Sequence, residues 1–183
     1  MALKNLKRIA LLIIPVVIVV SVVLIFYIPS IQQSSKSTIP ATTSCPTNVI
    51  APLKHGVFIF NKNECAWESV KVEKYWVPEK DGIYLLVFMQ EWCGACHMYE
   101  PIFNKYVLDH VSSEITFVTI CLGKGWKPGD SIEKTFYKWN IRATPTTIIV
   151  EVENGKTSRT SIFEGVMSYE RLDNFIKKFL ESG

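Results

Sequence analysis

The feature that most constrains this 183-residue chain is a pair of cysteines that directly follows an apolar run. The run is residues 83–89 (IYLLVFM), and Cys93 and Cys96 come next with two residues between them. An uninterrupted apolar run of this length is typical of a strand buried on both faces of a sheet. A helix that opens at the pair would favour the thiolate of Cys93 through its free N–H groups and its dipole. Cys93 would then attack a partner disulfide, and Cys96 would resolve the mixed intermediate.

The N-terminus has the composition of a membrane segment. Residues 1–8 are basic, and residues 9–28 are 20 residues without a charge, which as a helix cover about 30 Å. No small-X-small cleavage site follows, so we expect a retained transmembrane anchor; a cleaved signal peptide is the alternative. Three basic residues precede the span and only Lys36 follows it closely. This asymmetry predicts a single-pass protein with a cytoplasmic N-terminus and an extracytoplasmic domain.

After the span, the composition changes twice. Residues 29–47 contain nine Ser or Thr and three Pro, so we expect a flexible stalk over residues 29–50. Residues 51–183 are then long enough for one domain with its own core. Residues 29–183 carry 17 basic and 17 acidic side chains. Because no basic surplus is present to meet phosphates, we expect no nucleic-acid partner.

Periodicity and turn signals predict the order of the elements in the domain. We expect strands at residues 55–60, 83–89, 115–122, 146–152 and 157–163, the last two joined by a hairpin at Asn154-Gly155. Helices should follow the cysteine pair, where Pro101 would kink the helix, and should begin again at a capping box of Asp130 with Glu133 and at Ser168. The last helix has an apolar stripe of Leu172, Phe175, Ile176, Phe179 and Leu180. Residues 64–76 fit a helix imperfectly and are ambiguous.

Five features in this order resemble the thioredoxin-fold family. They are Trp92-Cys93-Gly94-Ala95-Cys96, Pro101, the stretch of residues 140–146 (NIRATPT), the Asn154-Gly155 hairpin, and Phe163-Glu164-Gly165. The resemblance covers roughly residues 82–180 and, weakly, residues 55–81. It implies an α/β thioredoxin fold, with a central mixed sheet flanked by helices, after the N-terminal transmembrane helix.

The same resemblance implies roles for particular residues. Cys93 would be the exposed nucleophile, Cys96 the resolving cysteine, and Pro145 a cis proline facing them. A cis proline leaves the backbone of Thr144 free to pair with a substrate strand, which would make Thr144 and Pro145 substrate-binding residues. Trp92 would be a docking aromatic beside the sulfur. An ordinary strand entry is the alternative interpretation of Thr-Pro-Thr.

Three residues near the pair bear on its chemistry. Between the cysteines, Gly94 is followed by Ala95 where typical thioredoxins have Pro, and this intervening pair influences redox poise. Val87 stands where typical thioredoxins carry a buried Asp, so the proton-accepting role of that Asp must be absent or filled by another group. His97 lies four residues after Cys93, where an imidazolium would help to hold the thiolate; a solvated polar residue is the alternative.

The remaining cysteines carry weaker expectations. Cys45 and Cys65 flank the start of the domain, and they are either a structural disulfide or two free thiols. Cys121 lies in an apolar strand, and we expect a buried small hydrophobe that stays away from the active pair. We interpret the glycine-rich residues 123–129 (GKGWKPG) as a surface insertion, since the phosphate-loop spacing is missing. We expect no metal site.

These observations predict a membrane-anchored, extracytoplasmic thiol–disulfide oxidoreductase. Its substrates would be protein thiols or disulfides, its partner a membrane electron donor or acceptor, and its only redox group the Cys93–Cys96 disulfide, with no other cofactor. The direction of electron flow stays open. Two alternatives belong to other classes: a c-type haem electron-transfer protein, since residues 93–97 also read Cys-X-X-Cys-His, and a non-catalytic adaptor of the same fold.

Overall fold

The structure is a computed structural model that describes residues 45–183. The segments expected as a cytoplasmic N-terminus and a transmembrane anchor, and the stalk up to residue 44, lie outside the described residues. Within residues 45–183, no helix has the length and apolar character needed to cross a bilayer.

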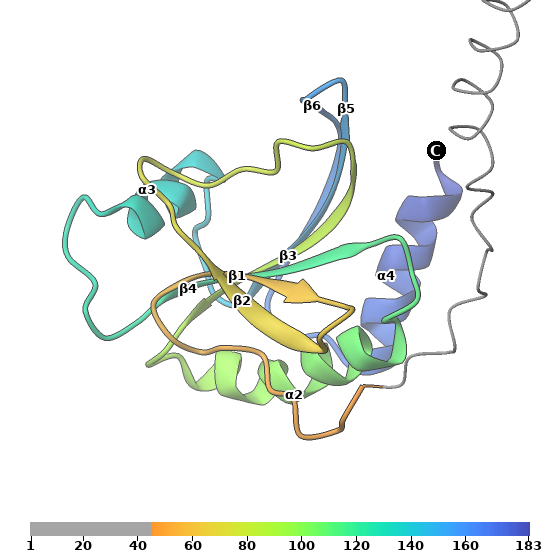
Figure 1. Cartoon of the computed structure of the whole chain (residues 1–183), viewed down its shortest axis with the longest axis horizontal. Helices are drawn as coiled ribbons and strands as arrows, with labels where there is room; N and C mark the ends of the chain where they lie inside the picture. The colour runs from red at the N-terminus through yellow and green to blue at the C-terminus, as the bar shows by residue number, and fades with distance from the viewer. Residues whose placement is uncertain (1–44) are drawn as a thin grey trace, which may run out of the picture. The chain divides into compact units, whose positions relative to one another are not determined.

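Six strands form one mixed sheet in the order β2-β1-β4-β3-β5-β6 (Figure 1). β3 and β4 are parallel, and every other neighbouring pair is antiparallel. The strands are β1 (Gly56–Asn61), β2 (Ala66–Val70), β3 (Gly82–Gln90), β4 (Thr116–Leu122), β5 (Thr146–Glu153) and β6 (Lys156–Glu164). β3 lies between β4 and β5, so its side chains from Tyr84 to Met89 are all buried. This position explains the continuous apolar run in the sequence.

Helices cover both faces of the sheet. α2 (Gly94–Asp109) and α4 (Tyr169–Glu181) pack on one face, and α3 (Ser131–Lys138) packs on the other (Figure 1). Alternate residues of β3 feed the two cores: Val87 contributes to the α2 and α4 side, and Phe88 to the α3 side. The expected arrangement, a mixed sheet flanked by helices, is confirmed. α2 continues through Pro101, which lies in its interior.

Capping residues set the starts of α3 and α4 as the sequence predicts. Asp130 caps α3 and accepts hydrogen bonds from Ile132 N at 3.0 Å and Glu133 N at 2.8 Å. In a full capping box, the Glu133 carboxylate would accept a hydrogen bond from the backbone N–H of Asp130. Here it accepts from Gly129 N instead. Ser168 caps α4.

The hairpin between β5 and β6 also forms where the sequence predicts it. Asn154 has φ 53° and Gly155 has φ 69°. Both values are positive, as a two-residue turn that matches the strand twist requires, and Asn-Gly tolerates them best.

The structure decides one ambiguous segment and corrects one expectation. Ala66–Val70, within the ambiguous segment, is strand β2 and not a helix. The ring centroid of Trp67 lies 5.2 Å from that of Phe60 and 6.1 Å from that of Phe103. Tertiary packing therefore decides between strand and helix here, which the local sequence pattern does not. Leu180 is 42% exposed although it belongs to the predicted apolar stripe of α4, whereas its neighbour Phe179 is buried in the core.

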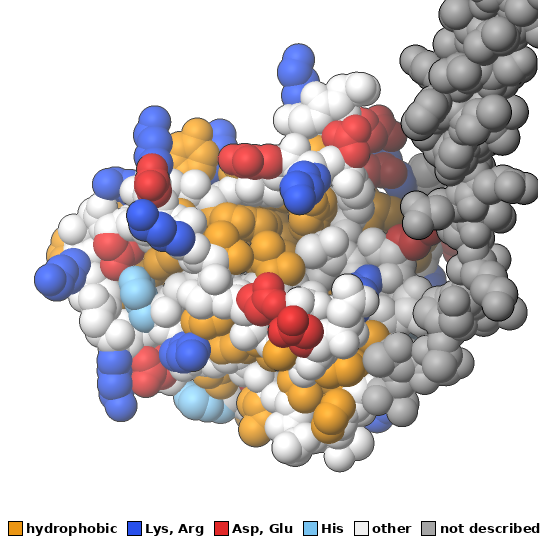
Figure 2. Space-filling model, viewed as in Figure 1, with side chains coloured by type: hydrophobic (Ala, Val, Ile, Leu, Met, Phe, Trp, Pro, Cys, Tyr) orange, Lys and Arg blue, Asp and Glu red, His pale blue; other side chains and the backbone are white. Residues whose placement is uncertain are grey.

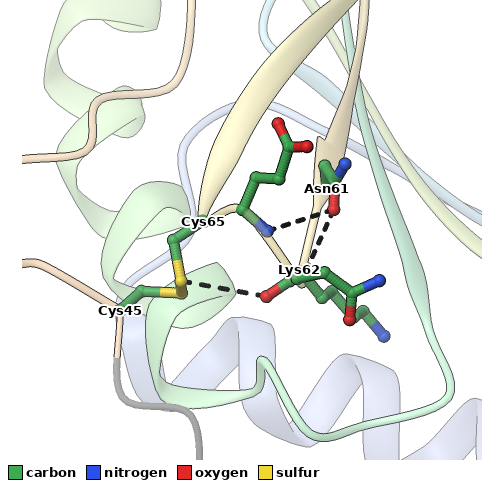
Figure 3. The surroundings of a disulfide bond; sticks show 6 residues. Cys45, Asn61, Lys62 and Cys65 are labelled. Atoms are coloured by element: carbon green, nitrogen blue, oxygen red, sulfur yellow. Dashed lines mark hydrogen bonds between the residues drawn. A yellow bond between two sulfur atoms is a disulfide. The ribbon is translucent and has the colours of Figure 1, made fainter.

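The chain from residue 45 to residue 53 packs along α2, and a disulfide holds its start (Figure 3). Cys45 and Cys65 are bonded with a Cα–Cα distance of 5.4 Å. Asn104 Nδ2 donates to Val49 O, and Ala51 N donates to Glu100 Oε1 at 3.1 Å. Residues 45–50, which the sequence analysis assigned to the stalk, are therefore part of the folded domain. The disulfide and the contacts with α2 decide this, and composition alone does not show them.

A polar turn presents Cys65 to its partner. Asn61 Oδ1 accepts hydrogen bonds from Asn63 N at 3.0 Å and Glu64 N at 3.2 Å, which shapes the connection from β1 to β2 (Figure 3). Cys65 follows with φ 50°. Its sulfur lies 3.8 Å from Lys62 O; this is a van der Waals contact, since a disulfide sulfur carries no hydrogen.

Candidate active site

The cysteine pair lies where β3 ends and α2 begins. Cys93 is the N-cap of α2, and its sulfur accepts a hydrogen bond from Cys96 N at 3.2 Å. The backbone carbonyl of Cys93 accepts from Cys96 N at 3.0 Å and His97 N at 3.2 Å. A buried strand that runs directly into a helix thus places the first sulfur at free N–H groups of the first helical turn, as the sequence predicts.

The environment of Cys93 favours its thiolate. Partial burial acts to raise the pKa of this thiol. Hydrogen bonds from the side chains of Cys96 and Thr144 and from the backbone N–H groups of Cys96 and Ala95 outweigh that effect, so the pKa lies below the usual 9.0. Cys93 is also partly exposed. An accessible sulfur with a depressed pKa has the properties of a nucleophile.

Cys96 has the opposite properties. Its side chain has no exposed surface. Burial, followed by the hydrogen bond that its thiol makes to Cys93, raises the pKa of Cys96 to about 12. At neutral pH, Cys96 is therefore a protonated thiol, protected from outside reagents and within reach of Cys93. This division of roles suits a pair in which one sulfur attacks and the other resolves.

Thr144 and Pro145 lie against Cys93, although 51 residues separate Thr144 from it in the sequence. The Cys93 thiol donates to Thr144 O at 3.4 Å, and the Thr144–Pro145 peptide bond is cis. Thr144 Oγ1 donates to Gln90 Oε1 at 3.3 Å, and Pro145 O accepts from Gly165 N at 2.8 Å. The structure thus brings together the residues that sequence reasoning placed at one site.

The other residues singled out from the sequence surround this centre. Trp92 is 58% exposed, which is unusual for a tryptophan in a folded domain. A side chain built at Gly94 would meet no atom within 4 Å, so the surface next to Cys93 is open. His97 donates from Nε2 to Glu91 O at 2.7 Å. This nitrogen bonds to the backbone of the motif and is not among the groups that bond to the Cys93 sulfur.

Sequence reasoning missed Glu91, which fastens the next loop to the motif. Glu91 Oε2 accepts from Lys124 N at 2.6 Å, and Glu91 Oε1 lies 3.6 Å from Lys124 Nζ. Gly123 fits beneath this contact because a Cβ there would lie 2.5 Å from His55 N and 2.7 Å from Glu91 Oε2. The glycine at the start of residues 123–129 was the available signal, because close backbone approach requires it.

The position of the absent aspartate is flanked by hydroxyl groups. Val87 lies between Thr119 on β4 and Thr147 on β5 in the strand register, and all three side chains are fully buried. Tyr99, from the first turns of α2, bonds through its hydroxyl to Thr147 Oγ1 at 2.9 Å. Neutral hydroxyl groups therefore occupy this part of the core, and no carboxylate lies on either side of Val87 in the register.

Cys121 is buried, as expected, but it lies nearer to the active pair than the sequence analysis predicted. It pairs with Met89 in the parallel register of β3 and β4. The pKa of Cys121 is raised to about 12. Burial is the main cause, followed by repulsion between a Cys121 thiolate and negative charge at Cys96, Glu91 and Cys93. Parallel strands end on the same side of the sheet, and this brings Cys121 close to the pair.

The residues of the Cys-X-X-Cys-His stretch do not fit covalent haem attachment. That chemistry needs both sulfurs at the haem edge and the histidine free to ligate iron. Cys96 has no exposed surface, and Nε2 of His97 is bonded to Glu91 O. Within residues 45–183, the structure also has no group of three or more His, Cys, Asp or Glu side chains placed to hold a metal ion.

Two solved thioredoxin structures are similar to this chain. Thioredoxin from Aeropyrum pernix is 14% identical, with 69% of this chain and 95% of that one covered and a TM-score of 0.48. The germline-specific thioredoxin Deadhead from Drosophila melanogaster is 20% identical, with 55% and 83% covered and a TM-score of 0.40. The Thioredoxin family model matches residues 68–178, which is more than half of the chain. This match supports thiol–disulfide oxidoreductase activity at the level of the family, and the chain belongs to the thioredoxin family.

Proposed function

We propose that this protein is a membrane-anchored, extracytoplasmic thiol–disulfide oxidoreductase that uses Cys93 and Cys96. The observation that carries the proposal is the asymmetry between the two sulfurs. Cys93 is accessible and its pKa is lowered, whereas Cys96 is buried with a pKa of about 12. Such a pair is suited to exchanging a disulfide with a partner protein.

The reaction follows from the positions of the two sulfurs. In the reducing direction, the Cys93 thiolate attacks one sulfur of a substrate disulfide, and the other substrate sulfur leaves as a thiolate. Cys96 then loses its proton and attacks the Cys93 sulfur, which breaks the mixed disulfide and releases the second substrate thiolate. The products are the Cys93–Cys96 disulfide and a substrate that has gained two electrons. The same steps in reverse oxidise a dithiol substrate.

Thr144, Pro145 and Trp92 are the proposed substrate-binding residues. Thr144 O lies 3.4 Å from the Cys93 sulfur, so a substrate segment bonded to that sulfur passes along the backbone of Thr144. An extended segment can pair there as an added strand. Trp92, 58% exposed beside Cys93, offers a large apolar surface to the same segment. Gly94, Ala95 and His97 lie within or next to the motif, and we expect them to influence the reduction potential of the Cys93–Cys96 pair.

The proposed location rests on the N-terminal sequence and on the second disulfide. Residues 9–28 have the length and composition of a span, and the basic residues precede it. The Cys45–Cys65 disulfide suits an oxidising compartment. The proposed partners are therefore extracytoplasmic protein thiols or disulfides and a membrane protein that donates or accepts electrons.

The test is the reduction potential of the Cys93–Cys96 pair, measured on the full chain in non-ionic detergent with glutathione or dithiothreitol buffers. A value near roughly −270 mV would indicate a reductase supplied by a membrane donor, and a value near roughly −120 mV an oxidant of secreted proteins. Cys93→Ser should abolish turnover, and Cys96→Ser should accumulate mixed disulfides with substrate. The matched control is Cys121→Ser, which should keep the redox transition. The absence of any transition in the wild-type protein would refute the proposal, and retained partner binding in that case would favour an adaptor.

A further inference from the structure

The connection from β4 to β5 contacts the cysteine motif at both of its ends. At its start, Lys124 N donates to the Glu91 carboxylate, two residues before Cys93. At its end, Thr144 O accepts from the Cys93 thiol. The intervening residues form the β4–α3 loop and α3. The backbone at the two ends of this connection therefore lies at the cysteine motif.

This connection carries a local surplus of positive charge. Residues 123–142 contain five basic and two acidic side chains, whereas residues 29–183 contain 17 of each. The basic residues are Lys124, Lys127, Lys134, Lys138 and Arg142, and the acidic residues are Asp130 and Glu133. Figure 2 shows Lys and Arg side chains on the side of the molecule where the β4–α3 loop, α3 and the connection from β2 to β3 lie together, with fewer acidic ones among them.

The acidic side chains of this region are occupied by local bonds. Asp130 caps α3 and lies 3.3 Å from His55 Nε2. Glu133 accepts from Gly129 N and from the Tyr137 hydroxyl. Glu91 Oε2 accepts from Lys124 N, and its other oxygen lies 3.6 Å from Lys124 Nζ.

Three cations of the connection are exposed and accessible to a partner. The side chain of Lys124 is 93% exposed, and its contact with Glu91 is long. Lys127 and Arg142 are exposed and make no ion pair with any residue in the described part of the chain. Glu164 lines one pocket with Arg142 but forms no salt bridge with it there. The β4–α3 loop and the α3–β5 loop, which are bonded to the cysteine motif through Lys124 N and Thr144 O, thus present exposed positive charge.

We propose that the preferred protein substrates carry acidic side chains next to their reactive cysteine, and that Lys124, Lys127 and Arg142 bind them. The inference rests on the proposed function, since it concerns the substrate of that site. Complementary charge raises the rate of encounter and selects among partners, even where each exposed pair contributes little to affinity. The exposed Trp92 supplies apolar contact, and the three cations supply the selection by charge.

Two peptides that differ only in charge test the proposal. Each contains one disulfide, flanked by Asp in one peptide and by Lys in the other, and the neutral probe is 2-hydroxyethyl disulfide. The full chain in non-ionic detergent is compared with the triple variant Lys124→Gln/Lys127→Gln/Arg142→Gln. The matched control is Lys80→Gln/Lys156→Gln/Lys178→Gln, which removes the same charge at exposed positions outside the connection. The readout is kcat/KM at low and high salt, with dithiothreitol as the reductant that regenerates the Cys93–Cys96 dithiol and with its direct reaction with each disulfide subtracted.

The wild-type protein should prefer the Asp-flanked peptide, and the triple variant should lose about tenfold in kcat/KM for it. Turnover of the neutral disulfide should not change, the control variant should match the wild type, and the preference should fade at about 1 M salt. Equal kcat/KM for the two peptides, or an equal loss in the control variant, would overturn the proposal while leaving the oxidoreductase function standing. Failure of the wild type both to reduce the neutral disulfide and to oxidise the corresponding thiol would overturn the proposed function, and this inference with it.

Discussion

At the scale of single residues, the chemistry depends on the different surroundings of two identical thiols. Hydrogen bonds and the start of α2 lower the pKa of Cys93 below 9.0, in spite of its partial burial. Burial and the bond to Cys93 raise the pKa of Cys96 to about 12. Because the thiolate is the nucleophile, the two sulfurs should react with outside reagents over different ranges of pH.

Alkylation by iodoacetamide should show this difference. The rate at Cys93 should rise with pH to a midpoint below 9.0, because its thiolate forms earlier than that of an ordinary cysteine. Cys96 and Cys121 should stay unmodified over this range in the folded protein, and mass spectrometry would locate the label. Cys93→Ser is the control and should remove the alkylation that occurs below pH 9.0. A midpoint at or above 9.0, or first labelling at Cys96, would contradict the prediction.

A second residue-scale prediction concerns the buried hydroxyl pair of Tyr99 and Thr147. Tyr99→Phe removes one partner and leaves Thr147 Oγ1 buried without its bond, which should cost about 1 to 3 kcal/mol of unfolding free energy. Thr147→Val should cost a similar amount. The double variant should cost clearly less than the sum, since neither polar group then remains. Urea denaturation measures all three, and strict additivity would show that the bond contributes nothing.

At the scale of elements, the side chain of Arg159 on β6 contacts both β5 and α4. Arg159 donates from Nε to Glu151 Oε2 at 2.6 Å and from Nη1 to Phe179 O at 3.0 Å, and its guanidinium lies 4.5 Å from the Phe179 ring centroid. Arg159→Ala should lower the unfolding free energy by about 1 to 2 kcal/mol, because charge-assisted bonds to a carboxylate and to a helix C-terminus are lost together. Lys178→Ala, an exposed change in the same helix, should stay within about 0.5 kcal/mol. Equal effects of the two changes would contradict this role for Arg159.

At the scale of the whole molecule, the Cys45–Cys65 disulfide ties the start of the domain to the β1–β2 turn across 20 residues. Closing a loop of this size stabilises a fold by about 3 kcal/mol, mainly by restricting the unfolded chain. Cys45→Ser/Cys65→Ser should lose about that much in urea denaturation, while the Cys93–Cys96 pair keeps its redox transition. If removing the Cys45–Cys65 disulfide abolished that redox transition in a folded protein, this disulfide would belong to the active site and not to the scaffold.

The two cysteine pairs show how far sequence reasoning reaches. The sequence predicts Cys93 and Cys96 as the redox pair because a strand, a tight spacing and a helix act within a few residues of each other. For Cys45 and Cys65 the sequence allows either a disulfide or two thiols, because pairing depends on the distance between segments that no local pattern fixes. β2 was missed for the same reason: Trp67 is held by Phe60 and Phe103 from distant segments.

The sequence alone determined where most strands and helices lie. Local periodicity, capping residues and the Asn-Gly turn are sufficient for this, because each depends on neighbours a few residues away. Only the tertiary structure decided which distant groups meet at the site. Thr144 O reaches the Cys93 sulfur, Glu91 fastens the start of the β4–α3 loop, and Thr147 and Thr119 flank Val87 in the register. These contacts arise from strand order and packing, which are set by burial of the whole core and not by any one segment.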